Sequence, residues 1–144
     1  MSTSNHQNSD TRPLKHHVLV VDKDPEFGQA LSALIAGEHV RSKHSESVDA
    51  FLDSGCRARI DLVLLEIDVF DPAALDDLRL LRTHFGEGPN TRIVAVTAFA
   101  PAEFPRFLQQ WGADTHLPRL HNPESMQAAI SAEIAKLADL TALD

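Results

Sequence analysis

Short runs of β type alternate five times with amphipathic helical stretches along this chain. Two of these runs, residues 17–21 and 60–67, are dominated by Val, Leu and Ile, as is typical of strands buried on both faces of a parallel sheet. Parallel strands joined through helices require right-handed crossovers. The alternation therefore predicts one α/β domain, a doubly wound five-stranded parallel sheet with helices on both faces.

Capping signals locate the helices. Asp24-Pro25 and Asn122-Pro123 each place an N-cap residue before a proline at the first helical position. The strand at residues 39–44 is polar, so we expect it near an edge of the sheet. The expected strands cover residues 17–21, 39–44, 60–67, 92–97 and 113–117. The expected helices run from Pro25 to a stop at Gly37, from Ser45 or Ser47 through Leu52, from about Pro72 to His84, across a stripe at 104–111, and from Pro123 to about Leu140.

The polar N-terminus, residues 1–15, is expected to be a disordered tail before a single domain over residues 16–140. Residues 141–144 are either the natural end or the start of a linker. No apolar run is long enough to cross a bilayer. Cys56 is the only cysteine, which excludes an internal disulfide and favours a cytoplasmic location.

The charge balance is acidic, with 13 Lys and Arg against 21 Asp and Glu and a formal net charge of −8. Duplex binding needs a surplus of cationic side chains to displace counterions. We therefore expect no direct contact with nucleic acid and no membrane association, and partners that are proteins.

Polar residues close the predicted strands. Asp22-Lys23-Asp24 follow the first strand, Glu66 and Asp68 close the third, Thr97 ends the fourth and Arg119 follows the fifth. In open α/β sheets ligands bind beyond the carboxyl ends of the strands, where the strand order reverses. These residues are therefore the candidate functional site.

Four segments together resemble the receiver domain of two-component response regulators, a flavodoxin-like fold. They are VLVVDKDPE from Val18, DLVLLEID from Asp61, IVAVTA from Ile93 and GADTHL from Gly112, in the order and at the separations usual in that family. The resemblance covers about residues 16–138. It implies two acidic residues that bind Mg²⁺ beside a phosphoacceptor aspartate, a hydroxyl residue and a lysine. Those places are held here by Asp22, Lys23, Glu66, Thr97 and Arg119.

The departures from that pattern predict a degenerate phosphoacceptor pocket. The family's three carboxylates and one lysine sum to −2, which calls for a divalent cation, whereas Asp22, Lys23, Glu66 and Arg119 sum to −1 + 1 − 1 + 1 = 0. We expect no catalytic residue, no cofactor, and Mg²⁺ binding that is lost or weak. Glu66 is expected to pair with Lys23 or Arg119, while Asp24 caps a helix and Asp68 is a solvated loop residue.

Two further features bear on signalling. His116 stands at the place of the family's switching aromatic residue, although a half-buried strand residue is the simpler interpretation. Thr97 is either bonded locally or a relic of the switch.

Phe104, Phe107 and Trp111 form an apolar helix stripe with Leu108 that is chiefly core. The resemblance implies a dimerisation or output surface on the fourth helix, fifth strand and fifth helix, so a homodimer or a partner is expected there, with Trp111 as an anchor.

Three functions compete. The favoured one is a non-enzymatic pseudo-receiver that signals through contacts with a signalling protein or an attached output domain. The second is a working phosphoacceptor that is phosphorylated at Glu66 or a nearby aspartate. The third is a flavin- or nucleotide-binding domain, which the carboxylates and Pro25 of the first loop disfavour because they supply no phosphate cradle.

Overall fold

The computed structural model describes residues 15–56, 58–86, 91–99 and 102–142. The predicted polar tail lies outside these ranges apart from Lys15. The elements are β1 (His16–Val21), α2 (Pro25–Ile35), β2 (Val40–Ser45), α3 (Val48–Asp53), β3 (Leu62–Glu66), α4 (Ala73–Phe85), β4 (Arg92–Thr97), α5 (Phe104–Gln110), β5 (Thr115–Pro118), the 3-10 helix η1 (Pro123–Met126) and α6 (Gln127–Ala142).

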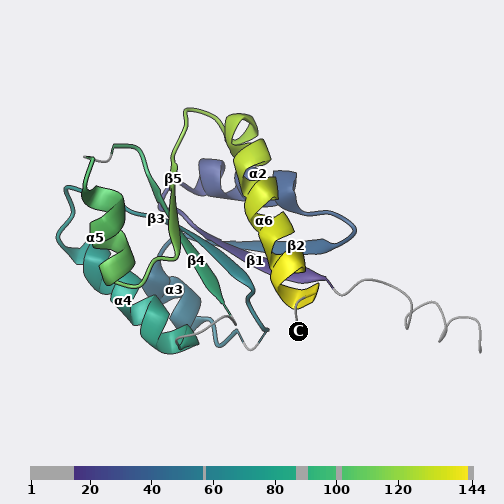
Figure 1. Ribbon diagram of the computed structural model, residues 1–144, viewed down its shortest axis with the longest axis horizontal. Coiled ribbons are helices and arrows are strands. Elements are labelled where there is room, and N and C mark those ends of the chain that lie inside the picture. Colours follow the sequence, from purple (N-terminus) through teal and green to yellow (C-terminus); the bar gives the residue numbers. More distant parts are fainter. Residues whose placement is uncertain (1–14, 57, 87–90, 100–101, 143–144) are drawn as a thin grey trace, which may run out of the picture.

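Five parallel strands form one sheet in the order β2-β1-β3-β4-β5 (Figure 1). The predicted fold class, a doubly wound five-stranded parallel sheet, is confirmed. The strand order reverses between β1 and β3, so the carboxyl ends of these two strands mark the switch point of the fold. β2 and β5 are the edge strands, and the half-buried residues of β2 agree with its polar sequence.

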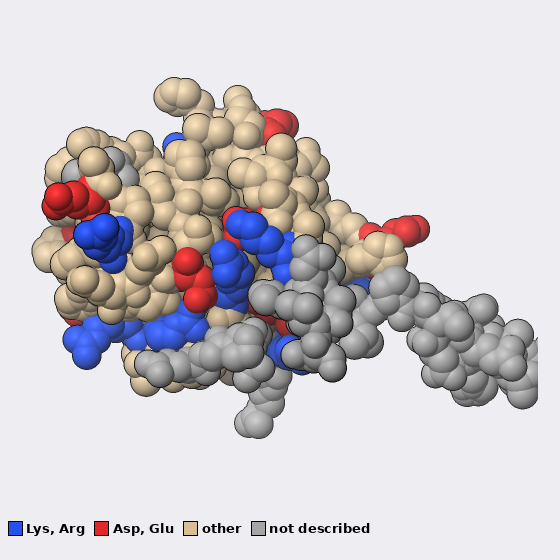
Figure 2. Space-filling model, in the orientation of Figure 1, with Lys and Arg blue, Asp and Glu red and all other residues tan. Residues whose placement is uncertain are grey.

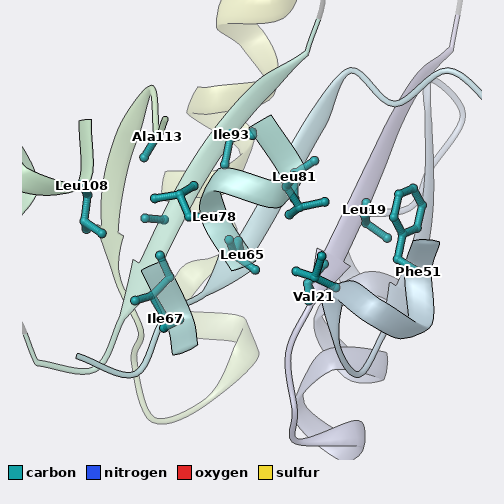
Figure 3. Close-up of a cluster of buried hydrophobic side chains, with 14 of the residues drawn as sticks. Leu19, Val21, Phe51, Leu65, Ile67, Leu78, Leu81, Ile93, Leu108 and Ala113 are labelled. Carbon is teal, nitrogen blue, oxygen red and sulfur yellow. The ribbon is translucent and has the colours of Figure 1, made fainter. Parts of the chain in front are cut away.

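Helices cover the sheet on both faces, with α3, α4 and α5 on one side and α2 and α6 on the other (Figure 1). Consecutive strand residues point to opposite faces. In β1, Leu19 and Val21 therefore pack in the first layer, while Val18 and Val20 pack in the second. Figure 3 shows the first layer, in which Leu78 and Leu81 of α4 lie over Leu65 and Ile93 of the sheet.

Hydrogen bonds to the side chains of capping residues mark where α2 and α3 begin. The Asp24 carboxylate accepts hydrogen bonds from the backbone N–H groups of Glu26 and Phe27, as predicted, and the Ser47 hydroxyl caps α3. α2 ends at Ile35, earlier than the predicted stop, and Gly37 forms an isolated bridge with Val40 instead. The Asn122 cap opens a 3-10 turn before α6 begins, where the sequence had predicted one continuous helix.

β5 begins at Thr115, two residues later than predicted, and extends to Pro118. A proline lacks the N–H that a central strand would need, but it is tolerated on an edge strand. No helix in the described ranges is both long and apolar enough to cross a membrane.

Candidate functional site

The carboxyl ends of the strands bring Asp22, Glu66 and Arg119 together. Asp22 follows β1, Glu66 ends β3 and Arg119 follows β5. Val21 is in register with Leu65, so the next residue of each strand, Asp22 and Glu66, also lie side by side. The sheet thus places two carboxylates at its switch point, and the loop after β5 brings a guanidinium onto them.

Arg119 binds both carboxylates. Its Nε lies 3.1 Å from Asp22 Oδ2 and 3.2 Å from Glu66 Oε2, and a terminal nitrogen donates to Asp22 Oδ1 at 3.3 Å. The guanidinium carbon also lies 3.9 Å from the ring centroid of Phe27 on α2, a cation–π contact. Burial lowers the pKa of Arg119, but the hydrogen bond and charge of Asp22 and the charge of Glu66 outweigh it and raise the pKa overall.

Asp22 is the most deeply held member of this group, with only 4% of its surface exposed. Its N–H donates to the Ser45 carbonyl (3.1 Å), and its carbonyl bonds to His44 Nε2 (2.8 Å). Its Oδ1 also accepts from the N–H of Asp24 (2.9 Å). Hydrogen bonds to other groups of the protein therefore hold both the backbone and the carboxylate of Asp22 in place.

Glu66 is partly buried, and its surroundings disfavour the charged form of its carboxylate. Burial and the neighbouring charge of Asp22 raise the pKa of Glu66 above its ordinary value of 4.5. The hydrogen bond from the Lys23 N–H, which lies 3.4 Å from Oε1, and the charge of Arg119 act in the opposite direction. Arg119 therefore neutralises Glu66 only in part, because it is shared with Asp22.

Lys23 differs from the sequence expectation. Its side chain is 69% exposed, and its ammonium lies 3.6 Å from Asp68 Oδ2. Only its backbone N–H reaches Glu66. The three side chains in mutual contact, Asp22, Glu66 and Arg119, sum to −1 − 1 + 1 = −1, so the neutral group of four that the sequence predicted is not assembled. Of the two predicted partners of Glu66, the side chain of Arg119 is the one found.

Thr97 and His116 form a separate pair next to this group. The Thr97 hydroxyl is hydrogen bonded to His116 Nε2, and either group can donate. Thr97 is buried, and its carbonyl accepts the N–H of Arg119 at 2.7 Å. Burial lowers the pKa of His116 below its ordinary value of 6.5 and so favours the neutral imidazole. The Thr97 hydroxyl is thus bonded locally, and His116 is the half-buried strand residue that the sequence indicated.

Sequence reasoning missed His44 and Gly28. A side chain at position 28 would overlap the His44 ring, so the glycine lets this imidazole lie against α2 and reach the Asp22 carbonyl. A glycine inside an otherwise helical pattern signals close packing, and Gly28 carried that signal. Nothing in the polar β2 sequence distinguished His44 from the other exposed-looking residues of an edge strand.

The predicted interface residues lie apart from the acidic group, on α5 and at its C-cap, Trp111. Phe104, Phe107 and Trp111 stack along one flank of this helix, with ring centroids 6.1 Å and 6.0 Å apart. Phe104 and Trp111 also pack against the first core layer. In the described part of the chain, no group of three or more His, Cys, Asp or Glu side chains is arranged to hold a metal ion.

The sequence matches no family model and no curated protein, but the structure matches many solved ones. A response regulator from Thermotoga maritima superposes with a TM-score of 0.67 at 20% identity, over 85% of this chain and 99% of that one. A CheY-like receiver domain protein from Methanospirillum hungatei gives 0.68 at 18% identity, over 87% and 98%. A response regulator receiver protein from Burkholderia phymatum gives 0.61 at 24% identity, over 82% and 94%. The chain therefore has the receiver-domain fold.

Proposed function

We propose that this chain is an atypical receiver domain that acts in signal transduction through protein contacts, without aspartyl phosphorylation and without Mg²⁺. The receiver fold supports the first half of this proposal. The observation that carries the second half is the position of Arg119, whose guanidinium is bound to both carboxylates at the switch point. The domain is expected to act in the cytoplasm on a signalling protein or an attached output domain.

Electrostatics favour Arg119 over a divalent ion as the occupant of this group. Mg²⁺ requires near-octahedral oxygen ligands and sheds its water reluctantly. Here one oxygen of Asp22 accepts from Arg119 Nε, the other accepts from Arg119 and from the Asp24 N–H, and Glu66 is shared with the same guanidinium. A metal would have to displace the bidentate ion pair between Arg119 and the buried Asp22. It would also lack one ligand, because Lys23 stands where the resemblance implies a carboxylate.

Without the metal, the phosphoacceptor chemistry loses its main support. Phosphoryl transfer depends on positioning and on neutralisation of the charge that develops on the transferred group. The Glu66 carboxylate stands one methylene further from the backbone than an aspartate would, and a misplacement of about 1 Å can cost a hundredfold in rate. The Thr97 hydroxyl is also engaged with His116 rather than with this group. We therefore propose that the domain does not act as an enzyme.

Intact mass spectrometry after incubation with acetyl phosphate and MgCl₂ tests the proposal. The wild-type chain should show no added phosphoryl group, and titration calorimetry should show no micromolar binding of Mg²⁺. The matched control is the triple variant Lys23→Asp, Glu66→Asp, Arg119→Lys, which restores the residue types of the resemblance and should gain both properties. A phosphoryl group on the wild type that is lost in Glu66→Gln would establish the working phosphoacceptor instead.

A further inference from the structure

The aromatic side chains of α5 form a continuous, partly exposed ridge, defined here as Phe104, Phe107 and Trp111. Phe107, in the middle, is 40% exposed although it is flanked by an aromatic ring on each side. Leu108 on the same helix is fully buried and supplies the core contact. The ridge therefore presents aromatic surface beyond what anchors the helix to the sheet, and partly exposed aromatic clusters are typical of interaction sites.

Trp111, at one end of the ridge, lies beside α4. Arg79 of α4 lies over the Trp111 ring, with its guanidinium carbon 5.3 Å from the ring centroid. A groove of about 450 Å³ begins at this contact and runs between α4 and the end of α5. Its walls include Arg79, Thr83, Gln110 and Trp111. Unlike the α5–β5–α6 surface that the sequence resemblance implied, this α4–α5 groove is lined by residues of α4 and by no residue of β5 or α6.

The groove and the ridge each carry an exposed arginine, Arg79 and Arg106 respectively. Arg79 and Arg106 are both exposed, and neither forms an ion pair within the described residues. On the face seen in Figure 2, blue and red side chains lie next to one another at the left of the molecule, where Figure 1 places α4 and α5. In a chain with a net charge of −8, two exposed arginines without an ion-pair partner among the described residues therefore lie beside the aromatic ridge.

Arg82 shows how an arginine with a structural role differs from these two. Its three nitrogens donate to the carbonyls of Gly112, Gly86 and Thr91 and to the Asp114 carboxylate. Asp114 in turn accepts the Ile93 N–H at 2.8 Å. The one carboxylate that lines the groove is thus already committed to Arg82 and the sheet, which leaves Arg79 without a carboxylate partner. Glu103, at the start of α5, lies near Arg106 at the outer side of the ridge.

We infer that the α4–α5 groove and the adjoining ridge bind an acidic segment of a partner protein that carries a large apolar side chain. The inference rests on the proposed function as a protein-interaction module. Carboxylates of the segment would pair with Arg79 and Arg106, since the guanidinium matches a carboxylate bidentately. The apolar side chain would lie against Trp111 and Phe107. Aromatic and arginine side chains that meet in this way dominate the binding energy of protein interfaces.

Selection of a phage-displayed library of random dodecapeptides on the wild-type chain, followed by synthesis of the best peptide, tests this inference. The selected peptides should be enriched in Asp and Glu around a Leu, Phe or Trp. Their binding should shift amide NMR signals of α4 and α5. Arg79→Glu and Arg106→Glu should each weaken binding by about tenfold or more, because each replaces an attraction with a repulsion. Trp111→Ala should weaken it similarly.

Arg41→Glu is the matched control, because Arg41 is an exposed arginine on β2, at the opposite edge of the sheet; it should leave binding unchanged. Failure to select acidic peptides, or equal binding by wild type and both α4–α5 charge variants, would overturn the inference. So would sedimentation showing a dimer that Arg79→Glu dissociates, since a second copy would then occupy the groove. The acetyl phosphate experiment tests the group formed by Asp22, Glu66 and Arg119, whereas peptide binding tests the α4–α5 groove and the ridge. Either the proposed function or this inference can therefore fail without the other.

Discussion

Two guanidinium nitrogens of Arg119 donate hydrogen bonds to the two carboxylate oxygens of Asp22, at 3.1 Å and 3.3 Å, although the two residues are 97 positions apart in the chain. The same guanidinium reaches Glu66 and lies on the ring of Phe27. One side chain from the loop after β5 thereby ties together the ends of β1 and β3 and the beginning of α2. This internal cation stands where the resemblance implies a lysine beside a metal ion, and it supplies both a charge and a cross-link.

Arg119→Ala should destabilise the fold. It leaves the buried Asp22 carboxylate next to Glu66 with no cation between them, and removal of one partner of a buried ion pair costs about 3 kcal/mol. Arg119→Lys keeps the charge but cannot bridge two carboxylates and stack on Phe27 with the same geometry, so its loss should be smaller but measurable. Urea unfolding at neutral pH gives both values. Equal stability of Arg119→Ala and wild type would show that the cluster does not stabilise this edge of the sheet.

Gly28→Ala should destabilise the chain by about 1–3 kcal/mol, because the new methyl group overlaps the His44 ring. His44→Ala makes room for it, so the double variant should lose less stability than the sum of the two single variants. Gly37→Ala is the control, since a methyl group there meets no other atom within 4 Å and should have little effect. Additive losses in the urea-unfolding cycle would argue against the contact between helix and imidazole.

The stability of the chain should depend on pH through Glu66 in a defined direction. Burial raises the pKa of Glu66 above 4.5, so the folded state holds this proton more tightly than the unfolded state. Its contribution to the free energy of unfolding is therefore fully present below pH 4.5 and is lost as the pH rises through the folded pKa. Relative to Glu66→Gln, the wild type should become less stable between pH 4.5 and neutral pH. If urea unfolding gave the same difference in the free energy of unfolding between the two proteins at every pH in this range, the raised pKa of Glu66 would be contradicted.

The contribution of Glu133 to the free energy of unfolding should depend on pH in the opposite direction. It is 4% exposed on α6; burial alone would raise its pKa, but hydrogen bonds from Lys136 at 2.9 Å and Arg92 at 3.1 Å lower it overall. Its contribution is present above pH 4.5 and is lost as the pH falls through the folded pKa. Glu133→Gln should thus cost about 1.5–3 kcal/mol at pH 7, the range for hydrogen bonds to charged groups, and much less in acid. Thermal unfolding at both pH values checks this, and a loss in acid as large as that at pH 7 would contradict it.

The fold was readable from the sequence because its signals are local. Apolar runs such as residues 92–97 coincide with the observed strand, and Asp24 and Ser47 cap the helices that they were expected to begin. Two of the boundaries that moved, at Gly37 and after Asn122, are helix ends, where a few hydrogen bonds decide between alternatives of similar energy. The candidate residues were also locatable, since parallel strands bring their carboxyl ends to one edge.

The sequence by itself therefore determined the sheet, its two helical layers and the membership of the polar edge, because periodicity and capping act over a few residues. Only the tertiary structure decided which charges meet. Lys23 neighbours Asp22 in the chain, yet its side chain turns to Asp68, while Arg119 arrives from β5 and takes both carboxylates. Likewise, only the tertiary structure placed Arg79 of α4 over the ring of Trp111. Such pairings depend on the direction of each side chain from a fixed backbone, which no spacing along the sequence encodes.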